Sequence, residues 1–469
     1  MRPVSAEFLA KAADVQLLGC QDQTISDVKI DSREAADGDL FVCVIGEIND
    51  GHNFAESAYA NGCRAFLMSR RDAAERLLAK DPQVTVLLAE NTETAFRDMA
   101  KTYLDQFAVR KVAITGSVGK TSTRTYTDAV LSSRYNTKSA QKNLNTHLGL
   151  CMTCFRADEA TEVMVFEMGM DRSNEIAEYV DWVRPDIAVI TNVGISHLEK
   201  LGSRDAIADA KLEIVKYFGP DNLLIYNADS DYLNEEEITR RTGGNFRMFS
   251  VGSSEGCDLQ LLHVNTERAG GIRFTLKTKD IALDYAMPVL GEHNAIDAAL
   301  AVAVGLSLNV SMTQASKALE GVKANPRRMN AVKLGGVYVI DDTYNASPES
   351  MKAALDVLDQ IRAERKIAVL ADMLELGGME EQGHREVGER IASSSADVLF
   401  AIGPRARAYA ECAAANPDIQ VFYAEKLEDA EDRIQGMLLT GDAVLIKGSN
   451  ITGVAGLAQR IREKLSWER

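Results

Sequence analysis

The residues best suited to chemistry lie in the segment KVAITGSVGKTSTRT, from Lys111 to Thr125. An apolar strand is expected to end at Thr115, and a glycine-containing turn then leads into a helix that opens with a Lys-Thr pair. Glycines let the backbone approach phosphate oxygens, the lysine supplies a cation, and the threonine hydroxyl can ligate Mg²⁺. The predicted triphosphate-binding residues are Thr115, Gly116, Ser117, Val118, Gly119, Lys120, Thr121 and Ser122.

This segment departs from the general phosphate-loop pattern G-x-x-x-x-G-K-[ST] at one position. Ile114 stands where the first glycine of that pattern belongs. Taken alone, the segment predicts binding of a nucleoside triphosphate. An ordinary strand-turn-helix connection remains the alternative.

Three further polar residues follow apolar strands in the next hundred residues. Glu167 ends the run VMVFE and is placed to hold Mg²⁺, although a helix cap or a solvated strand end would also account for it. His197 and Lys211 follow a third strand. On residue type alone, a loop histidine is usually structural and a helical lysine usually lies on the surface.

The alternation of apolar, strand-like runs with helical stretches predicts an α/β protein. Three domains are expected, because 469 residues are too many for one ordinary hydrophobic core. The expected domains are a small α/β domain at 1–108, a central parallel-sheet domain with the phosphate loop at 109–325, and a Rossmann-like domain at 326–469. Strands are predicted at 39–46, 64–68, 111–116, 163–169, 186–194, 222–226, 337–342, 366–372, 396–403, 419–424 and 443–448. Hairpin-like strands are predicted within 257–290, and helices at 54–62, 92–107 and 295–308, the last preceded by Asn294.

Composition excludes several classes of protein. A formal net charge of −17 opposes binding to nucleic acid and to anionic membrane surfaces. No apolar run reaches the length of a membrane span, and the first residues do not resemble a signal peptide, so we expect a cytoplasmic protein. Seven scattered cysteines predict reduced thiols, and the C-x-x-C of Cys151 and Cys154 is interpreted as core packing.

In this order, the segments resemble the Mur ligase family, whose members form amides of the peptidoglycan stem peptide and share ancestry with folylpolyglutamate synthases. The family's phosphate loop has the short form T-G-x-x-G-K-[ST], which accounts for Ile114. The resemblance implies an ATP-dependent ligase with two Mg²⁺ ions. Thr121 and Glu167 would bind one ion and His197 the second, while Lys211 matches a lysine that is often carbamylated by CO₂ in the family and would then reach the second ion.

Later segments of the chain also resemble the family, in the parts that would contact the nucleotide and the amine substrate. They imply that His293 and Asn294 lie near adenine, that Arg328, or its neighbour Arg327, lies near the γ-phosphate, and that Asp342 meets the ribose. The stretch DDTYNASP, with Tyr344, Asn345 and Pro348, resembles the family members that add D-alanyl-D-alanine to a UDP-N-acetylmuramoyl tripeptide. The absence of a D-N-P-R motif and the segment VLIKGSN (444–450) agree with that subgroup.

The amino-terminal segment KIDSREAADGDLFVCVIGEINDGHNF resembles the domain that holds the UDP end of the substrate in the later ligases of the family. The implied contact residues are Ser32, Arg33, Asp50, Gly51 and His52. The segment KNLNTHLGLCMT adds Lys142, Asn143 and Asn145 as substrate residues, but Thr146 and Cys151 replace the asparagine and proline usual there.

The resemblance thus implies a monomeric, ATP-dependent amide ligase whose catalytic residues are Lys120, His197, Lys211 and Arg328. Its small-molecule substrates would be the UDP-linked tripeptide and D-alanyl-D-alanine. The alternatives are a Mur-type ligase that adds a diamino acid, a ligase like folylpolyglutamate synthase, or a nucleotide-dependent switch that joins nothing. The sequence leaves open whether the tripeptide ends in lysine or diaminopimelate.

Overall fold

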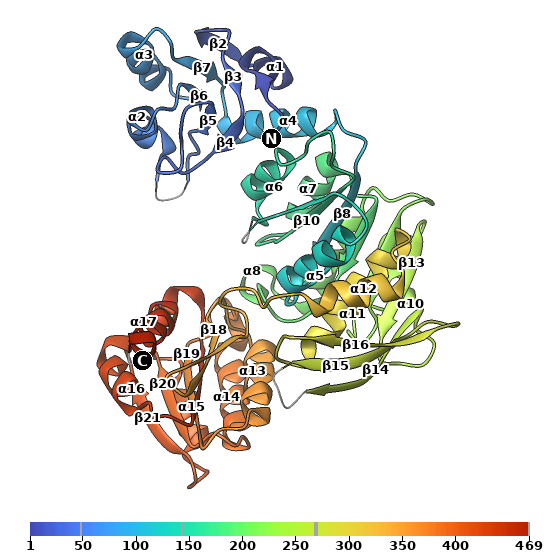
Figure 1. The fold of residues 1–469 in the computed structure, drawn as a ribbon, viewed down its shortest axis with the longest axis vertical. Helices are drawn as coiled ribbons and strands as arrows, with labels where there is room; N and C mark the ends of the chain where they lie inside the picture. Colours follow the sequence, from blue (N-terminus) through green and yellow to red (C-terminus); the bar gives the residue numbers. More distant parts are fainter. Residues whose placement is uncertain (47–48, 142–143, 267–270, 468–469) are drawn as a thin grey trace. The chain divides into compact units, whose positions relative to one another are not determined.

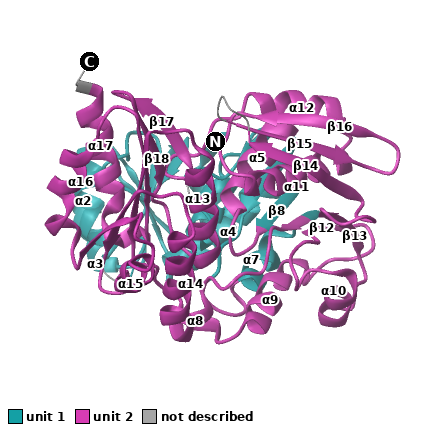
Figure 2. Ribbon diagram, turned by 90° about the horizontal axis from the view of Figure 1, so that it is seen from below, with its two compact units in different colours: residues 1–114, 134–170, 176–187 teal, residues 115–133, 171–175, 188–469 magenta. Residues whose placement is uncertain are grey.

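A computed structural model describes residues 1–46, 49–141, 144–266 and 271–467. Figure 1 shows the helices and strands of these residues, and Figure 2 shows the two compact units into which the chain is divided. Unit 1 comprises residues 1–114, 134–170 and 176–187, and unit 2 comprises residues 115–133, 171–175 and 188–469. Two of the predicted substrate residues, Lys142 and Asn143, lie outside the described residues.

The amino-terminal part of unit 1 folds around a five-stranded sheet with the strand order β2-β7-β6-β5-β4. Strands β4 to β7 run parallel, and β2 is antiparallel to β7. The loops after β4, β5 and β6 therefore lie along one edge of the sheet, where α/β folds usually bind ligands. The elements are β1 (Val4–Ser5), α1 (Ala6–Ala12), β2 (Gln16–Gly19), β3 (Thr24–Ile25), β4 (Asp27–Lys29), β5 (Asp39–Val42), η1 (Gly51–Phe54), α2 (Ala55–Ala60), β6 (Ala65–Met68), α3 (Arg71–Lys80), β7 (Thr85–Leu88) and α4 (Thr92–Leu104).

The remainder of unit 1 contains three parallel strands, with β10 between β8 and β9. All five residues of β10 and the last four of β8 are buried, as expected for parallel strands covered on both faces. The elements are β8 (Arg110–Thr115), β9 (Thr137–Ser139), α6 (His147–Cys154), β10 (Val163–Glu167), α7 (Glu175–Val183) and β11 (Ile187–Ile190). Thr115 at the end of β8, and the end of β11 from Ala188, belong to unit 2.

The first half of unit 2 places a helix pair beside strands in the order β16-β15-β14-β13-β12. β12, β13 and β14 are parallel, whereas β14, β15 and β16 form antiparallel pairs. The very apolar α11 packs against α5 and against the strands. The elements are α5 (Lys120–Ser132), α8 (Leu198–Leu201), α9 (Arg204–Leu212), η2 (Glu213–Val215), β12 (Leu223–Asn227), α10 (Glu235–Thr242), β13 (Arg247–Gly252), β14 (Leu259–Thr266), β15 (Ile272–Lys277), β16 (Ala282–Met287), α11 (His293–Ser307) and α12 (Met312–Glu320).

The second half of unit 2 is a six-stranded sheet with the order β17-β18-β22-β19-β20-β21. Five strands are parallel, and the edge strand β17 is antiparallel to β18. The elements are β17 (Asn330–Leu334), β18 (Val337–Asp342), α13 (Pro348–Gln360), β19 (Arg365–Ala371), η3 (Gly377–Met379), α14 (Glu380–Ala392), β20 (Val398–Ile402), α15 (Arg407–Ala413), β21 (Gln420–Ala424), η4 (Leu427–Asp429), α16 (Glu431–Met437), β22 (Asp442–Lys447), η5 (Asn450–Thr452) and α17 (Val454–Trp467).

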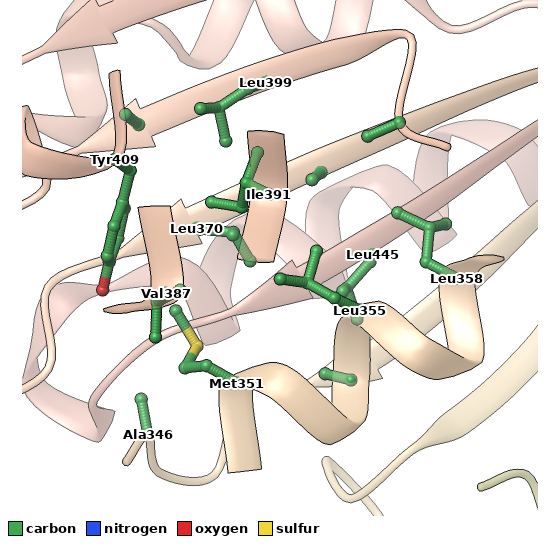
Figure 3. Close-up of a cluster of buried hydrophobic side chains, with 14 of the residues drawn as sticks. Ala346, Met351, Leu355, Leu358, Leu370, Val387, Ile391, Leu399, Tyr409 and Leu445 are labelled. Carbon is green, nitrogen blue, oxygen red and sulfur yellow. The ribbon is translucent and has the colours of Figure 1, made fainter. Parts of the chain in front are cut away.

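One apolar core holds α13, α14 and α15 against this sheet (Figure 3). Met351 and Leu355 of α13, Val387 of α14 and Leu445 of β22 all belong to this core. Ser347 begins α13 with a capping box, and Pro348 occupies the first turn, where its missing amide hydrogen costs nothing. Packing and capping therefore fix the loop that precedes α13.

The predicted strands and helices are confirmed within a few residues at their ends, and the antiparallel hairpins within 257–290 are confirmed as β14, β15 and β16. The expected helix start is wrong by two residues. α11 begins at His293, so Asn294 lies inside its first turn. The Asn294 side chain forms hydrogen bonds with Tyr126 and Leu290 instead of capping the helix. The sequence did not predict β17, whose pattern alternates weakly at the sheet edge.

The cysteine expectation is confirmed within the described residues. Cys151 and Cys154 are buried free thiols in α6, and burial raises the pKa of both. Their C-x-x-C spacing therefore reflects core packing. None of the described helices is long and apolar enough to cross a bilayer.

The core in Figure 3 makes a testable contribution to stability. We expect Leu355→Ala to lower the free energy of unfolding by about 2–5 kcal/mol, because Leu355 is fully buried and its truncation removes apolar contacts and leaves a cavity. The matched control Leu439→Ala removes a side chain that is 62% exposed and should change stability by less than about 0.5 kcal/mol. Denaturant unfolding measures both, and equal losses would contradict this account of the core.

Candidate active site

Two glycines shape the turn between β8 and α5. A Cβ atom at Gly116 would lie 1.8 Å from the hydroxyl oxygen of Thr191, and Gly116 has a φ of +148°. Gly119 has a φ of +82°, in the left-handed region, and is the N-cap residue of α5. Only glycine fits both positions, because a side chain would clash at the first and would strain the backbone at both.

Residues that follow β11 hold this turn from outside. The Asn192 side-chain oxygen accepts hydrogen bonds from the amides of Ser117 and Val118, each at 3.0 Å. The Thr191 hydroxyl donates to the carbonyl oxygen of Val118 at 2.5 Å. The turn is therefore organised by two side chains that the sequence analysis did not single out.

Lys120 lies across the turn. Its ammonium donates to the carbonyl oxygen of Gly116 at 2.7 Å and to that of Ser117 at 3.2 Å. Thr121 is buried, and Ser122 is half-buried in the same first turn of α5. A cation and the first turn of a helix thus stand together after a buried strand, as in phosphate-binding loops.

Lys120, His197 and Lys211 form an electrostatic cluster. Lys211 is buried in α9, so the expectation that a helical lysine lies on the surface is wrong here. Burial, and secondly the positive charge of Lys120, hold the pKa of Lys211 well below its ordinary value. The structure therefore brings together three residues that the sequence separates.

His197 is held in a left-handed conformation, with a φ of 65°, at the start of α8. Its Nδ1 atom lies 3.2 Å from a carboxylate oxygen of Asp171 and 3.4 Å from one of Glu375, yet it makes no hydrogen bond within the described part of the chain. Burial, followed by the charges of Lys120 and Lys211, lowers the pKa of His197 to about 4. The imidazole is therefore neutral near pH 7, the form that ligates metals.

Glu167 lies in unit 1, at the end of β10, with only 1% of its surface exposed. Its side chain accepts a hydrogen bond from the Asn145 amide at 3.1 Å. Burial excludes the alternative of a solvated strand end. The structure places a predicted metal ligand beside a predicted substrate residue.

These residues fit the way in which proteins bind Mg²⁺. Among the described residues, no group of three or more His, Cys, Asp and Glu side chains could hold a metal ion. Mg²⁺ is commonly bound through one or two carboxylates together with water and phosphate oxygens, so a closed protein cage is not required. Taken separately, the buried Glu167 carboxylate of unit 1 and the Thr121 hydroxyl of unit 2 are each of a kind that ligates Mg²⁺.

A second polar cluster lies at the carboxyl end of the six-stranded sheet. Lys447 donates to Asp342 at 2.5 Å and to the carbonyl oxygen of Asn345 at 2.9 Å. The other oxygen of Asp342 accepts from the Met329 amide at 3.1 Å. Lys447 and Asp342 are both buried, so the pair fixes the end of β18 and the loop that carries Tyr344 and Asn345.

The two neighbouring arginines have different surroundings. The Arg327 guanidinium donates to the carbonyl oxygen of Thr343 at 2.7 Å and to the side-chain oxygen of Asn450 at 2.5 Å. The Arg328 guanidinium stacks over the ring of Tyr344, 3.9 Å from its centroid. Arg327 thus has a structural role, which favours Arg328 as the phosphate-side arginine.

His293 and Asn294 begin α11, and Asn294 is buried whereas His293 is exposed. The Asn294 side chain accepts from the Tyr126 hydroxyl at 2.6 Å and donates to the carbonyl oxygen of Leu290 at 2.7 Å. Desolvation of the ring by the surrounding protein lowers the pKa of His293. In this structure Asn294 joins α11 to α5.

The predicted UDP contacts gather at the carboxyl edge of β4, β5 and β6 in unit 1. His52 is buried, and its Nδ1 atom lies 2.6 Å from Asp50 while its Nε2 atom accepts from the amide of Ser69 at 2.9 Å. Arg70 contacts Asp50 at 3.2 Å.

The other predicted residues lie along the same edge. Arg33 is exposed and pairs with Asp31, whereas Ser32 is buried. At Gly51, a Cβ atom would lie 2.7 Å from the Val44 amide nitrogen. The edge is a polar surface built by three successive strand ends.

Three family models match successive parts of the chain. The Mur ligase family catalytic domain matches residues 24–103, the Mur ligase middle domain matches residues 114–305, and the Mur ligase glutamate ligase domain matches residues 327–450. The chain is also 35% identical to the UDP-N-acetylmuramoyl-tripeptide–D-alanyl-D-alanine ligase of Bacillus subtilis, over 91% of this chain and 90% of that protein.

The chain belongs to the Mur ligase family. Among solved structures, MurF from Acinetobacter baumannii is similar over 99% of both chains, with a TM-score of 0.86 and 29% identity. MurF ligase from Thermotoga maritima in complex with ADP is similar over 94% of this chain and 98% of that one, with a TM-score of 0.78 and 25% identity. Both comparisons bear out the three-domain α/β fold of a Mur ligase.

Sequence reasoning missed four polar residues at the strand ends of this Mur ligase: Thr191, Asn192, Lys447 and Arg70. Thr191 and Asn192 follow β11 in the run ITNVG, and Lys447 ends β22. A polar residue at the end of a buried strand is the pattern that identified Glu167. The same pattern predicts these residues when it includes amides, hydroxyls and lysines as well as carboxylates.

The close approach at Gly116 is testable in this Mur ligase. We expect Gly116→Ala to weaken ADP binding by about tenfold or more, at least about 1.4 kcal/mol, because the added methyl group would meet the Thr191 hydroxyl. The control Gly436→Ala lies in α16, where a Cβ atom meets nothing within 4 Å, and should leave binding unchanged. Calorimetric titration measures both, and full affinity in Gly116→Ala would contradict the geometry of the turn.

Proposed function

We propose that this chain joins D-alanyl-D-alanine to a UDP-N-acetylmuramoyl tripeptide at the expense of ATP, in cytoplasmic peptidoglycan precursor synthesis. The observation that carries the proposal is the phosphate turn, in which Lys120 is clustered with a neutral His197 and the buried Lys211. The relatives that carry this name, over most of their length, support the choice of substrates.

The reaction needs an activated carboxylate, because a carboxylate is a poor acyl electrophile. A terminal carboxylate oxygen of the tripeptide attacks the γ-phosphorus of ATP, and the bond to the β-γ bridging oxygen breaks to release ADP. The amine of D-alanyl-D-alanine then attacks the carbonyl carbon of the acyl phosphate and loses a proton. The tetrahedral intermediate collapses, breaks the carbon–oxygen bond and releases phosphate.

The proposed phosphate-binding groups are the backbone amides of the turn from Thr115 to Ser122, the Lys120 ammonium and Arg328. The Lys120 ammonium faces phosphate oxygens and stabilises charge that develops during transfer. We assign Asp342 to the ribose and His293 and Asn294 to the adenine side. The similar MurF ligase from Thermotoga maritima was solved in complex with ADP, which supports nucleotide binding by this chain.

The proposed ligands of two magnesium ions are Thr121, Glu167, His197 and Lys211. When bound, the ions would offset the repulsion between the carboxylate and the triphosphate. The neutral imidazole of His197 can donate a lone pair. Lys211 requires carbamylation for this role, and its lowered pKa supplies the uncharged amine that reacts with CO₂.

Substrate binding is assigned to the two ends of the nucleotide peptide separately. The edge of unit 1 with Ser32, Arg33, Asp50, Gly51 and His52 would hold the UDP end. Asn145, Tyr344 and Asn345, together with Asn143, are assigned to the peptide and the amine. We keep the functional domains 1–108, 109–325 and 326–469 and a monomeric enzyme as part of the proposal.

Phosphate release measured in the presence of defined acceptors tests the proposal. We expect rapid release only with ATP, Mg²⁺, the UDP-tripeptide and D-alanyl-D-alanine together. A diamino acid or glutamate that replaces the dipeptide with equal effect would assign the chain to another ligase activity. Phosphate release without any acceptor would favour a nucleotide-dependent switch.

Lys120→Ala should lower kcat/KM in that assay by about 10²–10³-fold, because a charge aimed at the transferred phosphoryl group is lost. The control Lys279→Ala changes an exposed lysine in the turn between β15 and β16 and should retain full activity. An unaffected Lys120→Ala enzyme would refute the assignment of the phosphate turn.

Lys211→Ala tests carbamylation. We expect activity to fall by about 10²-fold or more and to recover in part with added formate or acetate, which can take the place of a carbamate oxygen donor. Lys120→Ala is the matched control, because it removes a cation and should not respond to these acids. Equal failure of rescue in both variants would contradict the carbamate role.

A further inference from the structure

Asp297 is a buried carboxyl group that the proposed reaction does not use. It lies on α11, one helical turn after His293 and Asn294, with 6% of its surface exposed. α11 packs along α5, the helix that begins at the phosphate turn. An acidic group so close to a phosphate-binding element is unexpected, because an ionised carboxylate repels phosphate.

The carboxyl group lies directly behind Gly119. A Cβ atom at Gly119 would lie 2.4 Å from Asp297 Oδ1 and 3.1 Å from Oδ2, so both oxygens pack against the backbone of the turn. Gly119 is the N-cap residue of α5, and Lys120 and Thr121 follow it. The Asp297 side chain therefore limits how far the backbone of the turn can move away from a bound phosphate.

The surroundings of Asp297 offer little to stabilise a negative charge. The Thr123 hydroxyl faces it and lowers the pKa of the carboxyl. Within the part of the chain that the structure describes, neither this hydroxyl nor the buried hydroxyl of Thr127, one turn further along α5, makes a well-formed hydrogen bond. Among the described residues, the charged and titratable groups that interact with Asp297 are Arg328 and Tyr126. Burial outweighs Thr123 and Arg328 and raises the pKa of Asp297 to about 7.

We propose that Asp297 is a positioning residue of the phosphate turn, whose carboxyl group packs behind Gly119 and takes up a proton when the nucleotide binds, so that a neutral carboxyl supports the turn in the complex. The inference rests on the proposed function, because it assumes that the turn binds phosphate. It adds a group that senses the charge of the nucleotide from behind the backbone. In the proposed complex Lys120 contacts the phosphates, whereas Asp297 lies behind the backbone of Gly119 and responds to their charge without touching them.

Electrostatics gives the direction in which nucleotide binding shifts the protonation of Asp297. Bound phosphates disfavour the ionised form of Asp297, so its pKa is higher in the complex than in the free protein. A complex that holds more protons than the free protein weakens as pH rises, by at most about tenfold per pH unit for one group. Nucleotide affinity should therefore fall as pH rises through 7.

Titration calorimetry with Mg²⁺ and ADP tests the coupling directly. At pH 7, in buffers of different ionisation enthalpy, we expect the wild-type protein to take up protons in excess of the value for Asp297→Asn. Between pH 6.5 and 8.5 the wild-type Kd should rise several-fold relative to that of Asp297→Asn. The control Asp280→Asn changes an exposed carboxyl in the turn after β15 and should match the wild type.

A second variant keeps the test decisive if Asp297→Asn fails to fold. Thr123→Val removes the hydroxyl that lowers the pKa of Asp297, so the fall in affinity should move to higher pH. Identical proton uptake and identical pH profiles in all variants would overturn the proposal. Failure of wild-type protein to bind ADP at any pH would instead refute the proposed function.

Discussion

Burial beside the positive charge of Lys120 sets the chemistry of the groups around it. The ammonium bridges two carbonyl groups of the phosphate turn, and burial, followed by the charge of Lys120, lowers the pKa of both His197 and Lys211. A neutral imidazole is a metal ligand, and a neutral lysine is a nucleophile towards CO₂. One cation at the start of α5 can therefore prepare two other residues for their proposed roles, besides binding phosphate itself.

The turn that positions this cation is held by side chains from outside it. Thr191 and Asn192 hold the turn through hydrogen bonds to Val118 and Ser117, and the glycines allow an approach that no side chain would permit. The buried pair of Lys447 and Asp342 serves the same purpose at the end of β18. Each of these polar groups lies at the carboxyl end of a buried strand. The sheets therefore fix the positions of the loops that carry the reactive groups.

Much of the fold can be predicted from the sequence, because buried parallel strands are recognisable as apolar runs. The phosphate turn can be predicted because Gly116 and Lys120 stand at a fixed spacing. β17 was missed because an edge strand with weak alternation has no distinct pattern. The partners of the turn were missed for another reason: Thr191 lies 73 residues from Val118, and Lys447 lies 105 residues from Asp342. Such contacts depend on strand order, which residue types do not encode locally. The burial of Lys211 is a similar case, since only tertiary packing converts a helical lysine into a buried amine.

The central claim is that the enzyme phosphorylates a carboxylate before an amine attacks it. Transfer of ¹⁸O tests this most directly, with the terminal carboxylate of the UDP-tripeptide labelled and the released phosphate analysed by mass spectrometry. The account predicts one ¹⁸O atom from that carboxylate in each phosphate released with D-alanyl-D-alanine. Phosphate without the label, formed alongside the amide product, would contradict it.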